Sequence, residues 1–180
     1  TSNQIRSRYI TFSLACRGMR TADSPYSAMY PGQLTDGIDS ISTYVYRGIV
    51  ADTLRGLDFL LTVPNVDKSS VVAWGNDIAL IAGALHGSVT HIVSTPAFLY
   101  DSINQRLKTS TYPLEEFNDY LRLYPEKEKK VSKILAYYDL RFHAPAITAD
   151  SLIIADNEGG LHDQTPLSAR TENMSGPATG

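Results

Sequence analysis

The sequence has 180 residues, enough for one domain with a sizeable core and too few for two domains of ordinary size. Its 43% hydrophobic and 19% charged residues are typical of a globular protein rather than a disordered one. The net charge of −3 lacks the basic excess of a nucleic-acid-binding protein, and the single cysteine excludes a disulfide framework and any multi-cysteine metal site.

We identify no targeting signal at the ends of the sequence. Residues 1–6 lack a basic region followed by an apolar core, so no signal peptide is visible, and no run is long enough to span a bilayer. The chain begins almost directly in an apolar segment and without Met, which suggests a fragment or a processed chain. No cellular compartment is assigned.

The first predicted element is a strand over residues 9–16, which are rich in β-branched and aromatic side chains. An irregular segment follows over 19–43, where several prolines and glycines argue against helix or strand. Apolar residues at positions 50, 54, 57 and 61 then form one stripe, which predicts a helix that ends at Pro64.

The central part of the sequence predicts a parallel sheet. Strands are expected over 71–74 and 89–95, with a helix over 77–85 between them that ends at a left-handed Gly87. Strands joined by a helix pair in parallel, because the helix serves as a right-handed crossover. Neither strand alternates cleanly between apolar and polar residues, so helices are expected on both faces of the sheet.

The C-terminal part is predicted to add a helical insertion at about residues 100–147 and a strand over 151–155. Residues 164–180 are mostly Ser, Thr, Pro, Gly and Ala and read as a polar tail or linker. We therefore expect one α/β domain over residues 1–163, with a parallel sheet, flanking helices and the insertion.

The turn after the strand at 71–74 has the frame of an α/β-hydrolase: an apolar strand, a glycine-containing turn and an apolar helix. In those enzymes the turn is Gly-x-Ser-x-Gly, and it presents the nucleophilic serine. Here the turn reads Gly75-Asn76-Asp77-Ile78-Ala79, without the serine and without the second glycine.

Two longer segments extend the likeness: Tyr30-Pro31-Gly32-Gln33-Leu34-Thr35-Asp36-Gly37-Ile38, and the aromatic run with Arg47 and Asp52 at 43–52. They resemble the acetyl xylan esterase and cephalosporin C deacetylase family of carbohydrate esterases, and the likeness covers roughly residues 9–165. The resemblance implies a partial α/β-hydrolase fold, a Ser-His-Asp triad that removes acetyl groups, no cofactor, and assembly into homo-oligomers.

The motifs that carry this family's chemistry are altered or missing here. The family's Arg-Gly-Gln reads Arg17-Gly18-Met19, and its serine is either replaced by Asn76 or deleted. The resemblance places the triad acid at Gly159 in an ungapped alignment, or at Asp163 if Leu161-His162-Asp163 matches the family's Leu-x-Asp. The family's His-Glu pair comes later still, and we expect this sequence to end before it.

Asp77 admits a different chemistry. Gly75-x-Asp77-x-Ala79 has the spacing with which epoxide hydrolases and haloalkane dehalogenases present a carboxylate nucleophile. The favoured alternative is that Asp77 caps the helix that follows it.

Together these features predict a catalytically degenerate esterase-like domain with a scaffold or binding role. The sequence favours a protein without enzymatic activity over an enzyme. The alternatives are an active deacetylase of which only part is present, or a hydrolase that uses Asp77. A homo-oligomer or larger assembly and a carbohydrate ligand are the possible partners, and no nucleic acid is expected.

Four tyrosines could line a sugar-binding mouth or could simply pack against the sheet: Tyr26, Tyr30, Tyr44 and Tyr46. No His, Asp and Glu cluster has metal-ligand spacing, so no metal is expected.

Overall fold

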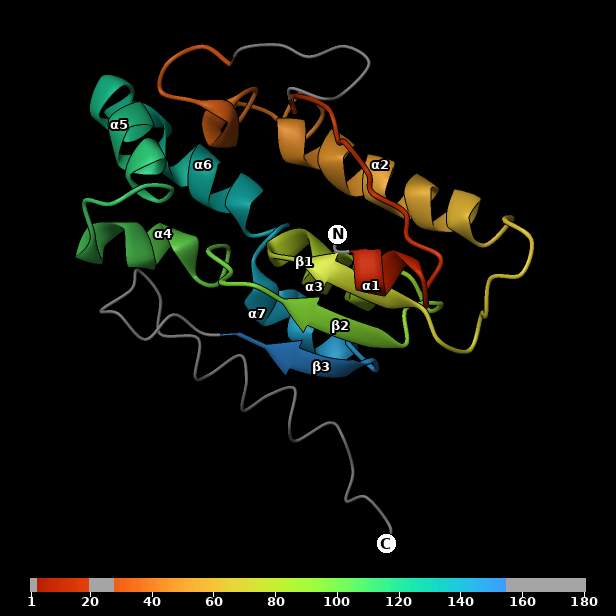
Figure 1. Ribbon diagram of the computed structural model, residues 1–180. Coiled ribbons are helices and arrows are strands. Elements are labelled where there is room, and N and C mark those ends of the chain that lie inside the picture. The colour runs from red at the N-terminus through yellow and green to blue at the C-terminus, as the bar shows by residue number, and fades with distance from the viewer. Residues whose placement is uncertain (1–2, 20–27, 155–180) are drawn as a thin grey trace, which may run out of the picture.

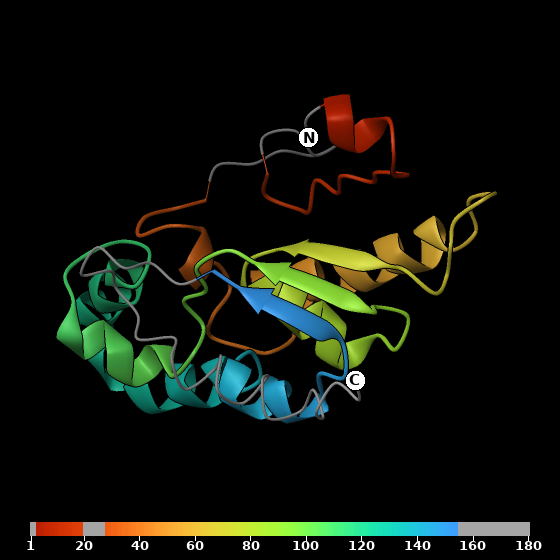
Figure 2. The same ribbon diagram turned by 60° about the horizontal axis from the view of Figure 1, so that its bottom comes forward.

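The structure is a computed structural model that describes residues 3–19 and 28–154. Three strands form one parallel sheet in the order β1 (Val72–Gly75), β2 (His91–Ser94) and β3 (Asp150–Ile153). The strands lie side by side and point the same way in both views (Figures 1 and 2). The predicted α/β class with a parallel, partial sheet is confirmed.

The helix α3 (Asp77–Leu85) lies at the centre of the fold. It connects β1 to β2 and packs against both strands, and on its other sides it contacts α2 (Val45–Leu60) and α7 (Leu140–His143). Its sequence is almost entirely apolar, as expected of a helix enclosed on all sides. The remaining elements are α1 (Asn3–Arg6), η1 (Gln33–Thr35), α4 (Ser102–Gln105), η2 (Arg106–Lys108), α5 (Glu115–Leu123), η3 (Pro125–Lys127), α6 (Glu128–Leu135) and η4 (Ala144–Ala146).

The short helices α4, α5 and α6 gather beyond the carboxyl ends of the strands, where the arrowheads point in both views (Figures 1 and 2). In open α/β sheets this end is where ligands usually bind. Buried apolar side chains join these helices to the sheet, among them Ile92, Phe117 and Val131. Among the described helices, none is both long and apolar enough to cross a membrane.

Among the described residues no helix covers one face of the sheet, and we call it the open face. This corrects the expectation that helices cover both faces. The strand register aligns Trp74 with Val93 and Leu152, so these side chains point to the same face. Trp74 is 66% exposed and Leu152 is 61% exposed, whereas Ile92 on the opposite face is buried against α3. Burial does alternate along β1 and β3, but three of their outer positions hold the apolar residues Val72, Trp74 and Leu152. The sequence pattern therefore could not tell an open face from a covered one.

Residues 9–16 do not form the predicted strand, and no strand in the described part of the chain lies beside them to pair with. It runs without strand structure, and Tyr9, Ile10 and Phe12 are exposed. Its inner end packs on α2, where Cys16 is buried with its Sγ 3.7 Å from Thr53 Oγ1. Strand propensity alone does not form a strand when no ladder partner is available.

The end of α3 also differs from the prediction. His86 is the C-cap residue, in extended conformation, and Gly87 is not among the described residues with positive φ. The helix therefore ends without a left-handed glycine. The predicted tail at 164–180 lies outside the described residues.

Candidate functional site

Asn76 is the turning point between β1 and α3. It is the N-cap residue of α3, with φ −105° and ψ −135°, and its side-chain oxygen accepts a hydrogen bond of 3.5 Å from the Ile78 N–H. Among the described non-glycine residues, positive φ occurs only at Asn65 and Asp101. The turn therefore holds no left-handed residue that would push a side chain outward under strain.

Asp77 is fully buried behind this turn. Its Oδ1 accepts hydrogen bonds from two successive backbone amides, Phe98 N at 2.9 Å and Leu99 N at 2.6 Å. Its Oδ2 is buried with no partner among the described residues. Burial raises the pKa of Asp77 to about 6, although the hydrogen bonds from Leu99 and Phe98 oppose that rise. The side chain thus anchors the loop after β2 to the start of α3.

The predicted capping role of Asp77 is therefore corrected. The cap position belongs to Asn76, one residue earlier, and the Asp77 carboxylate, which also interacts with its own backbone N–H, binds the loop after β2. Sequence reasoning missed this role because the partners are backbone amides about twenty residues away, which carry no side-chain signal.

Histidines do not lie at this turn in the described part of the chain. His91 begins β2 and pairs with Val72, whereas the turn follows Gly75 at the other end of the strands. His86 follows α3 and contacts Asp58 at 3.2 Å, so the nine-residue helix, about 14 Å long, separates it from Asn76. The His143 Nε2 lies 2.9 Å from the Tyr137 carbonyl oxygen. The candidate triad acid Asp163 and its neighbour His162 lie outside the described residues.

The segment Arg17-Gly18-Met19 is tied to α2 rather than to the turn. Arg17 Nε and Nη2 donate to Asp52 at 2.8 and 2.7 Å, in a two-pronged pair that lowers the pKa of Asp52. Its guanidinium lies directly over Gly48, where a Cβ would come within 2.3 Å of Nε. In this structure the motif anchors the chain to α2.

Two of the four tyrosines named from the sequence are packed inside. Tyr44 and Tyr46 are buried and stack on each other, with Tyr138 edge-on to both. Burial comes first in raising the pKa of Tyr44 and of Tyr46, and the negative charge of Asp77 adds to it in both. The packing interpretation is confirmed for these two. Tyr30 is exposed, and Tyr26 lies outside the described residues.

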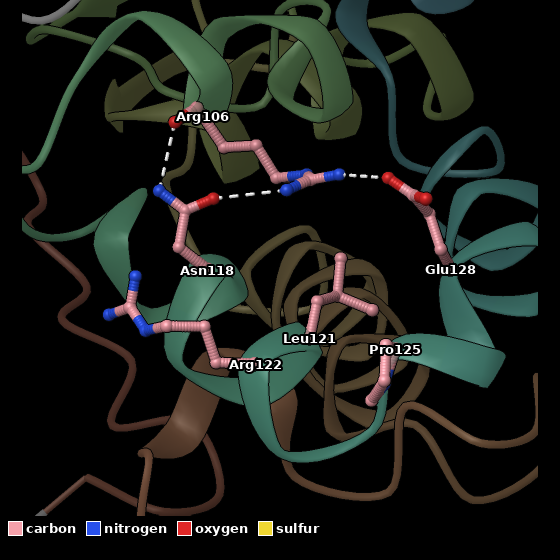
Figure 3. Close-up of a pocket in the computed structure, with 6 residues that line it drawn as sticks. All are labelled: Arg106, Asn118, Leu121, Arg122, Pro125 and Glu128. Carbon is pink, nitrogen blue, oxygen red and sulfur yellow. Dashed lines mark hydrogen bonds and ion pairs between the residues drawn. The ribbon is translucent and has the colours of Figure 1, made fainter.

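A pocket of about 220 Å³ lies among η2, α5 and α6 (Figure 3). Buried Arg106 crosses it, with Nη1 donating to Asn118 Oδ1 at 3.0 Å and Nη2 donating to Glu128, while its Nε is buried without a described partner. Arg122 points away from this network in Figure 3 and instead pairs with Glu115 and Asp119. Because Arg106 and Arg122 already have carboxylate partners, we interpret the pocket as a polar contact between helices.

No trio of His, Cys, Asp or Glu side chains within residues 3–19 and 28–154 is arranged to hold a metal ion. What the turn at Asn76 can do chemically therefore depends on its two polar side chains. An amide is a poor nucleophile, and a carboxylate can attack only if an oxygen reaches the substrate.

Comparisons with known proteins point to one family. The family model of acetyl xylan esterase matches residues 4–168. The structure resembles that of the acetyl xylan esterase from Paenibacillus sp. R4 with a TM-score of 0.74 and 26% identity, covering 88% of this chain and 54% of that one. Acetyl xylan esterase 1 from Thermoanaerobacterium sp. JW/SL YS485 matches with a TM-score of 0.67 and 27% identity, covering 82% and 49%. The chain thus spans about half the length of these structures.

Proposed function

Because this chain belongs to the acetyl xylan esterase family but carries Asn76 and a buried Asp77 at the turn where the nucleophile is expected, we propose that it is a catalytically degenerate esterase-like domain. Its role is then to bind or to act as a scaffold. The observation that carries this proposal is the engagement of both polar side chains of the turn in structure, one in the helix cap and one in the anchor of the loop after β2.

Acyl transfer needs a nucleophile, a base that takes its proton, and donors for the oxyanion. Removing the nucleophile abolishes most of the rate enhancement and leaves only what binding and oxyanion donors provide. At the described turn, Asn76 supplies no acid–base chemistry near neutral pH, and no described histidine stands beside it.

The test is hydrolysis of p-nitrophenyl acetate and of acetylated xylo-oligosaccharides by the purified chain, with the Paenibacillus sp. R4 esterase as positive control. We expect rates equal to the buffer blank. We expect the same for Asn76→Ser, because a serine without a base gains little. Saturable turnover by the unaltered chain would refute the proposal.

A second candidate is an active deacetylase of which this chain is one part. Two observations favour it: the chain spans about half of its structural relatives, and one sheet face exposes Trp74 and Leu152. The test is the same assay on the protein in its natural full-length context. If that protein is also inactive, the second candidate fails.

The Asp77 mechanism is the third reading. It requires an ester intermediate on a carboxylate whose Oδ1 already accepts two amides and whose Oδ2 is buried. Mass spectrometry after incubation with an activated ester distinguishes it: an adduct on Asp77 that Asp77→Asn abolishes would establish this mechanism.

A further inference from the structure

Residues 9–16 lie beyond the outer edge of β1, on the side away from β2, and run in the same general direction as β1 in both views (Figures 1 and 2). Alternate side chains of the segment face α2. A Cβ added at Gly56 of that helix would lie 3.1 Å from the Phe12 ring and 3.2 Å from the Leu14 side chain, and Cys16 is buried against the same helix. This period of two is that of a β-strand, although none of the described strands pairs with the segment.

The backbone of this segment offers unpaired donors and acceptors along its length. Tyr9 N donates to Ile5 O at one end, and Cys16 O accepts from Met19 N at the other. Between them, no backbone N–H or C=O of residues 10–15 has a hydrogen-bond partner within the described part of the chain. A partner strand is the group that satisfies such a row of donors and acceptors.

The outer edge of β1 offers a second such row. The carbonyl oxygens of Val71 and Gly75 accept hydrogen bonds at 2.9 and 2.7 Å from residues on the β2 side. Because successive backbone groups of a strand point to opposite edges, those of Val72 and Trp74 point away from β2. Within the described residues β1 ends the sheet on this side, so these groups have no strand to pair with.

Both edges rest on the same pair of packed helices. α2 holds residues 9–16 and contacts α3, and α3 in turn packs against β1. A strand between the edges would place one face on these helices and continue the open face of the sheet with the other, beside the exposed side chains of Val72 and Trp74. Apolar β-branched residues suit both faces of such a strand. The residues before the segment include Arg6 and Arg8 and no acid, so a carboxylate at one end of the strand meets cations there.

We propose that residues 10–15 and the outer edge of β1 together bind one extended strand of another polypeptide, which pairs with both edges at once. We call these two edges the strand site. Its ligand is a segment rich in Val, Ile and Thr with an acidic residue at one end. The sequence outside the described residues has no such run, because 20–27 and 155–180 consist mostly of polar or small residues. Binding of such a strand goes beyond the proposed function, since it requires neither activity nor inactivity at the turn.

The first test is an NMR titration of the isotopically labelled 180-residue chain with the peptide acetyl-Glu-Thr-Val-Ile-Val-Thr-amide, at a concentration where the chain is monomeric. We expect saturable shifts and slower amide exchange at Val72, Trp74 and residues 10–15. Replacing the Ile of the peptide by Pro should weaken binding about tenfold or more, because proline removes a donor and does not fit a central strand. Absence of saturable binding, or shifts confined to β3, whose outer edge is likewise unpaired in the described sheet, would overturn the proposal.

Methylated peptides show whether both edges are used. The N–H groups of a strand point alternately to its two sides, so methylation of the second and fourth peptide nitrogens blocks one side and methylation of the third and fifth blocks the other. A strand held on both sides should lose about tenfold in affinity with either set, because each set removes hydrogen bonds to one edge. If one set is tolerated, the peptide binds a single edge and the strand site is refuted.

Proline variants of the chain test the contribution of the N-terminal segment. Ile10→Pro and Ser13→Pro each remove one backbone N–H at an exposed residue, on opposite edges of the segment. We expect the variant whose lost N–H faced β1 to bind the peptide about tenfold more weakly, and the other to lose less. Ser110→Pro is the matched control, because Ser110 is exposed and follows Thr109, which is extended as a residue before proline must be. If neither variant binds more weakly than this control, the strand site is refuted, and if both unfold, the methylated peptides decide.

Hydrolysis of p-nitrophenyl acetate is measured on the same samples, so the two proposals fail separately. Turnover refutes the inactive-domain proposal and leaves the strand site standing. A peptide that fails to bind refutes the strand site alone.

Discussion

Asp77 is a carboxylate that the folded protein buries completely. A carboxyl group whose pKa is higher in the folded state than in the unfolded chain binds its proton more tightly when folded. For Asp77 the rise is from 3.8 to about 6. The free energy of unfolding that it contributes is therefore greatest below pH 4 and falls as the pH rises through 6.

We expect Asp77→Asn to remove this dependence. The wild-type chain should lose about 2 kcal/mol between pH 4 and 7 through this group alone, and the variant should lose that much less. Urea denaturation at several pH values measures the difference. Asp150→Asn, at an exposed carboxylate, is the control. Parallel pH curves for the wild type and Asp77→Asn would contradict the burial argument.

Gly32 is a second residue at which a buried carboxylate, that of Glu116, limits which substitutions the fold accepts. A Cβ at this position would lie 2.4 Å from the Glu116 carboxylate, which accepts hydrogen bonds from Thr35 N at 2.9 Å and from Thr35 Oγ1 at 3.0 Å. Glu116 therefore holds the loop that contains η1, and only glycine admits it so closely.

Gly32→Ala should lower the free energy of unfolding by roughly 1–3 kcal/mol, because the Glu116 side chain must leave its buried position. Gly87→Ala is the matched control, since no atom lies within 4 Å of a Cβ built there. We expect that change to be neutral or slightly stabilising. Equal effects of Gly32→Ala and Gly87→Ala on the free energy of unfolding in thermal denaturation would show that the Glu116 side chain moves aside at little cost.

At the scale of elements, α3 and the sheet have unequal surroundings. Leu80 of α3 is fully buried between the sheet and the other helices, whereas Leu152 of β3 lies on the open face and is 61% exposed. The same substitution at the two sites therefore separates core packing from strand propensity.

Leu80→Ala should cost about 2–5 kcal/mol, through lost transfer free energy and the cavity left behind. Leu152→Ala should cost less than about 1 kcal/mol, since little burial is lost. Urea denaturation of both variants is the measurement. A large loss at Leu152 would mean that this face is covered in solution.

The sequence indicated β1, β2, β3 and α3 well, because short apolar runs bounded by Gly and Pro and a nine-residue apolar helix leave few other folds. It failed at residues 9–16, where strand propensity is high but none of the described strands pairs with the segment. It also failed for Asp77, whose amide partners are 21 and 22 residues away, and for Asp39, which meets Lys127 across 88 residues. Local patterns predict elements, and they do not predict which side chains converge.

At the scale of the whole molecule, the open face is the dominant exposed apolar feature of the sheet. Val72, Trp74, Leu152 and Ile154 are each at least 45% exposed. Contiguous apolar surface of this kind usually becomes an interface or a cause of aggregation. The outer edges of β1 and β3 add unpaired strand edges within the described residues.

We expect the 180-residue chain to associate as its concentration rises. Trp74 is its single tryptophan, so its emission should shift to shorter wavelength as the face becomes covered. Sedimentation velocity provides the second measurement. Leu152→Lys should suppress both effects, while Leu107→Lys, at a comparably exposed leucine in η2, should not. A monomer with unchanged Trp74 emission at every concentration would show that the open face of the sheet remains exposed to solvent.

Cys16 lies where the N-terminal segment meets α2, and it is the only sulfhydryl in the sequence. Burial raises the pKa of this thiol, so both shielding and protonation slow its alkylation. A maleimide dye can attach only when the segment lifts from the helix. The rate of labelling at Cys16 therefore measures how often the N-terminal segment detaches from α2, and no engineered cysteine is needed.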